Sequence, residues 1–153
     1  MENSPGKAAL DRLEAFVGEW SIEMKFEGAP PGDIGARVTF EWMPGELFLI
    51  ERWQVPVPEA PDGIAIIGWD EGRGTLLQHY FDSRGVARVY EMSFEDGIWT
   101  LERTKPDFSE FEFGQRYSGK FSDDGKTIEG TWEIAHDKAN FEKDFDMNYK
   151  KVS

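Results

Sequence analysis

Apolar and polar side chains alternate along most of the chain, so that every second residue is apolar. Alternation with a period of two is typical of strands that bury one face. The first two such runs begin at Trp20 and at Val38. The pattern predicts about ten strands, near 20–26, 38–42, 46–54, 63–69, 74–82, 85–94, 97–104, 110–121, 127–135 and 141–151.

The N-terminal segment has a different period. Leu10, Leu13, Phe16 and Val17 recur at helical spacing, and Ser4-Pro5 before them offers a capping hydroxyl and a first-turn proline. A short helix is therefore expected over about 5–17, ending near Gly18.

The strands are separated by short turns that the sequence shows clearly. The segments "MPGE", "DEGRG", "DSRG", "EDG" and "SDDGK" each put Gly, Asp or Pro between two alternating runs. Consecutive short turns produce an antiparallel meander, and closing the meander into a barrel removes its two exposed edges. We expect one all-β domain over 1–153, a ten-stranded up-and-down β-barrel over about 18–152 with the short helix at one end.

Composition limits the classes of partner. The chain has 153 residues, 39% of them hydrophobic, which is enough to bury a sizeable core. Its 30 acidic and 17 basic residues give a formal charge of -13, so nucleic acid and anionic membranes are poor partners. There is no cysteine, which excludes disulfides and thiolate chemistry. We expect no metal site, since "KDFDMNYKK" and "SDDG" lack the EF-hand spacing.

The location follows from what the sequence does not contain. The N-terminus has no basic stretch leading into an apolar run, and no segment reaches the roughly 18 apolar residues of a membrane span. A cytoplasmic protein is the expectation, and the sequence leaves open a homodimer formed through an edge or the outer face.

Several motifs resemble a known family. The tripeptide "GEW" at 18–20 is similar to the Gly-x-Trp signature of lipocalin-like barrels. The long run from "PDGIAIIGWDEGRG" to "FEDGIW", with "FSDDGKTIEGTWE" and "DFDMNYKKV", resembles uncharacterised bacterial calycin-like proteins, a domain of unknown function. The resemblance covers nearly the whole chain and implies a lipocalin-like barrel. It supplies no catalytic residue to carry over.

The turns also predict which side chains point inward, because residues opposite each other in an antiparallel pair share a face. If Ser83-Arg84 is a two-residue turn, His79 lies opposite Arg88, on the face of Leu77 and Phe81. Two-residue turns at Asp96-Gly97 and Pro44-Gly45 assign the inward-facing residues of the neighbouring strands in the same way. The inferred interior holds Glu51, His79, Arg88, Tyr90, Arg103, Gln115, Tyr117 and Trp132, with Phe111 and Phe113 on the face of Gln115.

This interior favours a small-molecule site, since barrels of this size leave room for one small ligand. The preferred hypothesis is a partly apolar ligand with a polar or anionic head and no cofactor. Arg88 and Arg103 would bind the head. The remaining residues divide into those that orient the ligand, Tyr90, Gln115, Tyr117 and His79, and those that line the walls, Trp53, Trp99 and Trp132.

Three alternatives stay open. A cofactor-independent enzyme for proton transfer, cyclisation or hydration would use His79 as acid or base, Glu51 as its orienter and Arg88 to stabilise negative charge. A filled barrel would pair its arginines with Glu51. Haem is the third, because the nitrobindins among calycin-like barrels hold haem through a histidine; here His79 is the inward candidate, but Ile22 and Met24 replace glycines of the nitrobindin first strand.

Overall fold

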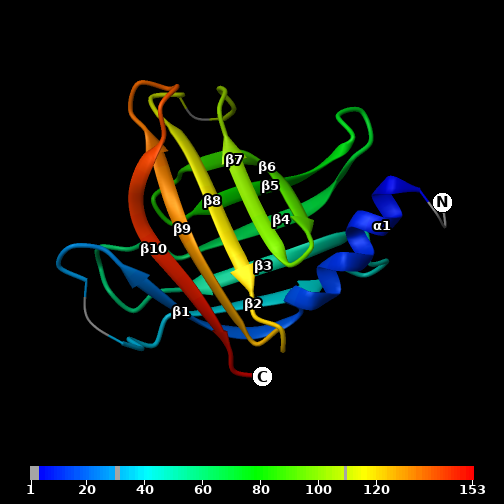
Figure 1. Cartoon of the computed structure of the whole chain (residues 1–153), viewed down its shortest axis with the longest axis horizontal. Helices are drawn as coiled ribbons and strands as arrows, with labels where there is room; N and C mark the ends of the chain where they lie inside the picture. The colour runs from blue at the N-terminus through cyan, green and yellow to red at the C-terminus, as the bar shows by residue number, and fades with distance from the viewer. Residues whose placement is uncertain (1–3, 30–31, 109) are drawn as a thin grey trace.

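The computed structural model describes residues 4–29, 32–108 and 110–153, and shows a closed barrel of ten antiparallel strands (Figure 1). Each strand pairs with its neighbours in sequence, and β1 pairs with β10 to close the ring. The predicted all-β up-and-down barrel is thus confirmed. The elements are α1 (Pro5–Arg12), η1 (Leu13–Phe16), β1 (Gly18–Lys25), β2 (Arg37–Trp42), β3 (Phe48–Gln54), β4 (Gly63–Asp70), β5 (Thr75–Asp82), β6 (Ala87–Glu95), β7 (Ile98–Arg103), β8 (Gly114–Phe121), β9 (Thr127–Ala135) and β10 (Glu142–Lys151).

The predicted N-terminal helix consists of two pieces. The side chain of Ser4 accepts a hydrogen bond from the backbone N–H of Lys7 and caps α1, as the sequence indicates. After Arg12 the chain tightens into the single 3-10 turn of η1. In the described part of the chain, no helix has the length and apolar character needed to cross a membrane.

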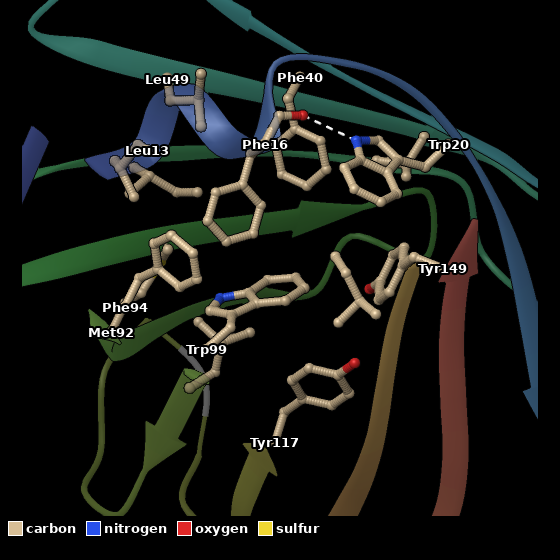
Figure 2. Close-up of a cluster of buried hydrophobic side chains, with 14 of the residues drawn as sticks. Leu13, Phe16, Trp20, Phe40, Leu49, Met92, Phe94, Trp99, Tyr117 and Tyr149 are labelled. Atoms are coloured by element: carbon tan, nitrogen blue, oxygen red, sulfur yellow. Dashed lines mark hydrogen bonds between the residues drawn. The ribbon is translucent and has the colours of Figure 1, made fainter. Parts of the chain in front are cut away.

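Aromatic rings fill the barrel end next to η1, which we call the closed end. Phe16 enters the barrel, and its ring centroid lies 4.9–5.3 Å from those of Phe40, Phe94, Trp99 and Phe121 (Figure 2). The backbone oxygen of Phe16 accepts a hydrogen bond from the buried indole N–H of Trp20 at 2.8 Å. Tilted and edge-on pairs at these distances are the favoured arrangements of aromatic rings. The closed end is therefore filled by protein.

The turn between β5 and β6 differs from the expected two-residue turn. It contains three residues, 83–85: the N–H of Asp82 donates to the oxygen of Val86, and the N–H of Gly85 donates back to the oxygen of Asp82. Gly85 has φ +85°, the left-handed conformation that closes three-residue hairpin turns.

This extra residue moves β5 by one position relative to β6. Gln78 lies opposite Tyr90 and His79 opposite Val89, so the expected pairing of His79 with Arg88 is wrong. A slip of one residue transfers every side chain of a strand to the other face. The β5 residues that face inward are Gln78 and its second neighbours, whereas the expected set, Leu77, His79 and Phe81, faces outward.

Two other turns keep the predicted faces. Asp96 and Gly97 both have positive φ, at 53° and 76°, and form the expected two-residue turn with Phe94 opposite Trp99. The turn between β2 and β3 is longer than expected, so Glu51 lies opposite Phe40 rather than Val38. Because this shift is two residues, Glu51 still points inward.

The eighth strand is shorter than predicted. It starts at Gly114, and the described residues between β7 and β8, 104–108 and 110–113, form a loop instead of extending the strand from 110. Phe111 and Phe113 therefore belong to this loop, where their rings lie 5.5 Å from the guanidinium carbons of Arg103 and Arg88.

Candidate functional site

The barrel half opposite the closed end encloses a cavity of about 370 Å³, which we call the interior cavity. This volume lies in the lower part of the range of small-molecule sites. Side chains from eight of the ten strands and from three loops line it. They are Ile22, Met24, Glu51, Trp53, Val55, Ala60, Pro61, Gln78, Tyr80, Arg84, Arg88, Tyr90, Trp99, Leu101, Phe113, Gln115, Trp132, Ile134, Asp144, Phe145, Met147 and Tyr149.

The cavity has a floor and a mouth. At the floor, Trp99 packs on Phe16 of the closed end and on Tyr149, with centroids 4.9 and 5.5 Å apart. At the mouth, Arg84 and Asp144 are exposed to solvent. The interior cavity therefore opens at one end of the barrel and ends blindly against an aromatic layer.

Four buried polar atoms in the described residues have no hydrogen-bond partner in the protein. They are Oε2 of Glu51, Oε1 of Gln78, Nε of Arg88 and Nε1 of Trp99. All four belong to residues that line the interior cavity. Buried polar groups in native proteins nearly always have partners, and each one left without a partner costs about 1–3 kcal/mol. The unused hydrogen-bonding capacity is thus concentrated in one place.

Glu51 is nearly completely buried, with 7% of its surface exposed. Burial raises the pKa of its carboxyl group from 4.5 to about 8, because the charged form loses its hydration. At neutral pH the group is mostly a neutral carboxylic acid, which donates one hydrogen bond and accepts others. Glu51 lies close enough to Tyr117 and Tyr149 that its charge adds to burial in raising the pKa of both phenols.

Gln115 holds two inward side chains on the opposite wall. Its Oε1 accepts a hydrogen bond of 2.8 Å from the hydroxyl of Tyr90 and one of 3.2 Å from Nη1 of Arg88. The Arg88 guanidinium also lies over the ring of Phe113 at 5.5 Å. These contacts position Arg88 near the mouth, with its Nε unpartnered.

A second polar group borders the mouth. The hydroxyl of Tyr80 donates to Oδ2 of Asp82 at 2.6 Å, and the same oxygen accepts from Nη2 of Arg84 at 2.7 Å. Burial raises the pKa of Asp82, but the hydrogen bonds from Arg84 and Tyr80 outweigh burial and lower it to about 2. The ring of Tyr80 stacks on Trp53, with centroids 5.3 Å apart. This group is internally satisfied and forms a rigid rim.

Most of the residues predicted from the sequence come together in this cavity. Those that line it are Glu51, Trp53, Arg88, Tyr90, Trp99, Gln115 and Trp132.

Tyr117 faces inward but does not line the cavity. Its ring lies flat against two glycines of the wall: a Cβ added to Gly130 would approach the phenolic oxygen to 2.2 Å, and one added to Gly119 to 2.8 Å. Its hydroxyl donates to the backbone oxygen of Met147 at 2.9 Å. Tyr117 therefore contributes to the packed wall beside the floor.

Arg103 is buried and paired with an acidic residue that the sequence analysis did not single out. Its Nε donates to Oδ2 of Asp107 at 2.8 Å, and its Nη2 donates to Oδ1 of Asp107 and to the oxygen of Glu110, both at 3.0 Å. Asp107 also accepts from the backbone N–H of Val89 at 2.7 Å. The ion pair thus ties the loop between β7 and β8 to the barrel at β6.

His79 lies on the outer face, in a surface pocket with Leu77 and Val89. The other histidine, His136, is 69% exposed near Glu142. Neither histidine of the chain points into the interior cavity, so the inward position of His79, on which the haem and enzyme alternatives depended, is wrong. Among the described residues, no group of three or more His, Cys, Asp or Glu side chains is arranged to hold a metal ion.

The sequence analysis missed Gln78 and Tyr80, which line the cavity in place of His79. The signal that could have found them is Gly85 in "DSRG". A glycine as the last residue of a hairpin loop favours a three-residue turn, here 83–85, and this turn length changes the register. Asp144 is exposed at the mouth, where β10 is irregular between Lys143 and Phe145.

The barrel is similar to a solved structure, the crystal structure of Rv2717c from M. tuberculosis. The two share 13% sequence identity with a TM-score of 0.62, over 95% of this chain and 98% of that chain. At this identity the likeness shows a common fold and nothing finer. No family model matches the chain. No curated protein matches it either, so the calycin-like resemblance is supported at the level of the barrel.

Proposed function

We propose that this protein binds a small, partly apolar molecule with a polar or anionic head inside the barrel. The observation that carries the proposal is the location of the four unpartnered polar atoms, all on residues that line one cavity. A ligand that offers hydrogen bonds and apolar surface would satisfy these atoms.

Arg88 is the group proposed to bind the head. Gln115 and Phe113 hold its guanidinium near the mouth, and its Nε is available for a further acceptor. A guanidinium favours carboxylate and similar anions because it can donate two parallel hydrogen bonds. Trp53, Trp99 and Trp132 supply apolar walls for the remainder of the ligand.

The filled-barrel alternative has less support. It requires the interior arginines to pair with Glu51, but within the part of the chain that the structure describes Arg103 pairs with Asp107, and no ion pair joins Glu51 to Arg88. A cytoplasmic location, an absence of nucleic-acid and membrane partners and a homodimer remain predictions from the sequence.

The first experiment is native mass spectrometry of the protein as purified from cells, followed by calorimetric titration with decanoate as the probe. We expect an adduct of small-molecule mass, or binding of decanoate to the bare chain. Arg88→Met should weaken decanoate binding at least about ten-fold, because it removes a charge-assisted contact. Arg52→Met is the matched control, since Arg52 pairs with Glu41 outside the cavity. A bare chain that does not bind decanoate, or equal losses in both variants, contradicts the proposal.

A further inference from the structure

Three polar groups of the interior cavity lie nearer the closed end than Arg88. Trp99 forms the floor, Glu51 interacts with Tyr149 beside it, and Gln78 is one inward position further from the rim than Tyr80. Glu51, Gln78 and Trp99 each have a buried atom without a partner in the described chain. We propose that these three side chains bind an uncharged hydrogen-bonding group, so that the ligand is an elongated apolar molecule with an anionic group at one end and a hydroxyl, carbonyl or amide group at the other. This inference rests on the proposed function of the same cavity.

The three side chains offer both donors and acceptors. Trp99 can only donate, through its indole N–H, and the unpartnered oxygen of Gln78 can only accept. Glu51 can do both while its carboxyl group holds a proton, as it mostly does at neutral pH. A hydroxyl, which donates one hydrogen bond and accepts two, matches this set. A carbonyl oxygen of the ligand could accept hydrogen bonds from the two donors, the indole N–H of Trp99 and the protonated carboxyl group of Glu51.

An anionic group does not fit the floor. Burial alone raises the pKa of Glu51, and no neighbouring cation among the described residues opposes it. The titratable groups that interact with Glu51 are the phenols of Tyr117 and Tyr149, from β8 and β10, and both are neutral at ordinary pH. A carboxylate placed here would lose its hydration without gaining a counter-charge. The anionic end of the ligand is therefore directed to Arg88.

The pairing of the strands separates the two polar positions. Glu51 lies opposite Ala65, Ala65 opposite Tyr80, and Tyr80 opposite Arg88. Three steps of about 4.8 Å between strands amount to roughly 14 Å along the curved wall. Because barrel strands tilt against the axis, such a row also runs from the mouth towards the floor. The two polar positions therefore lie three strands apart, and a ligand that bridges them extends along the cavity.

The cavity wall across from this row is largely apolar. On β7, β9 and β10 it includes Leu101, Trp132, Ile134 and Met147, and the thioether of Met147 accepts the indole N–H of Trp132 at 3.4 Å, which removes that donor. This wall suits a hydrocarbon segment that joins the two polar ends of one ligand.

The test compares two probes with the same number of heavy atoms, ω-hydroxydecanoate and undecanoate, by calorimetric titration. Shorter and longer probe pairs, with chains from hexanoate to dodecanoate, test a range of distances between the two polar positions. At the best length we expect the hydroxyl to tighten binding at least about five-fold, the effect of one or two buried hydrogen bonds. Glu51→Gln, which keeps a donor and an acceptor, should retain this preference. Glu51→Leu should abolish or reverse it while the protein still binds undecanoate.

The outcomes separate this inference from the proposed function. Undecanoate could bind in an Arg88-dependent manner while the hydroxyl gives no advantage at any chain length. Water, not the ligand, would then bind to the polar groups of the floor, and the inference would be overturned while the proposed function stands. Retention of the full preference in Glu51→Leu overturns it as well. If neither probe series binds, both fail together.

Discussion

The hydroxyl of Tyr90 donates a hydrogen bond of 2.8 Å to Oε1 of Gln115, and the same oxygen accepts a second hydrogen bond from Arg88. Tyr90 is almost fully buried, at 2% exposure. One amide oxygen therefore satisfies a buried phenol and positions the guanidinium proposed to bind the ligand.

Replacing Gln115 with leucine should disturb both functions of this oxygen. We expect Gln115→Leu to lower the free energy of unfolding by about 1–3 kcal/mol, because the Tyr90 hydroxyl loses its acceptor. Binding of decanoate should weaken several-fold, since Arg88 is no longer held. Denaturant unfolding and calorimetric titration measure the two effects, with Gln54→Leu at the exposed end of β3 as the control. A double-mutant cycle with Tyr90→Phe should show coupling; additive effects would contradict the assigned contact.

Glu51 should make stability depend on pH. Its pKa is about 8 in the folded protein and near 4.5 in the unfolded chain, so between these values the folded state binds more protons. Stability is therefore highest below pH 4.5, falls as pH rises towards 8, and changes no further above 8 on account of this group. The total loss relative to Glu51→Gln is several kcal/mol, at about 1.4 kcal/mol for each pH unit of the shift.

Urea unfolding of the wild type and Glu51→Gln across pH 4–9 measures this difference. The gap between the two proteins should widen in favour of the variant as pH rises. Glu129→Gln, at an exposed site on β9, is the control and should follow the wild type. A gap that stays constant with pH would mean that the Glu51 carboxyl titrates normally.

His79 should have no part in binding. It lies opposite Val89 on the outer face of the β5–β6 pair, outside the interior cavity. We expect His79→Ala to leave decanoate affinity within about two-fold of the wild type, whereas Gln78→Ala, its neighbour on the inner face, alters the affinity for ω-hydroxydecanoate by several-fold. Equal effects of the two substitutions would show that the strand register is wrong.

The contrast between His79 and Glu51 shows how far sequence can predict the site. Both positions were inferred from assumed turn lengths, and both turns were misjudged. The error at 44–47 was two residues, which preserves the face of Glu51, whereas the error at 83–85 was one residue, which reverses the face of His79. Alternation predicts that a strand has two faces, but only the exact turn decides which face is inside.

The barrel itself was predictable because its signals are local. Alternation gave the strands, and turn residues gave their antiparallel order. The role of Arg103 was not predictable in the same way, because its partner Asp107 lies in the loop between β7 and β8, outside the alternating runs. Loop conformation depends on tertiary contacts such as the Val89 N–H to Asp107 hydrogen bond, which no periodicity records.

The Arg103–Asp107 ion pair gives the last prediction. Both side chains are buried, at 1% and 7% exposure, so Asp107→Ala leaves a guanidinium charge inside without its carboxylate partner. We expect a loss of about 3–5 kcal/mol in the free energy of unfolding. Because the loop between β7 and β8 also carries Phe113, which contacts Arg88, decanoate affinity should fall in the protein that still folds.

Two further variants distinguish a stranded charge from simple loss of packing. Asp123→Ala, in the exposed turn before β9, should change stability by less than about 0.5 kcal/mol. The double variant Arg103→Leu/Asp107→Leu should be more stable than Asp107→Ala, because it removes both members of the ion pair and leaves no buried charge without a partner. If the double variant were less stable than the single one, the cost would lie in the packing of the loop, and the ion pair would not be what fastens the loop to β6.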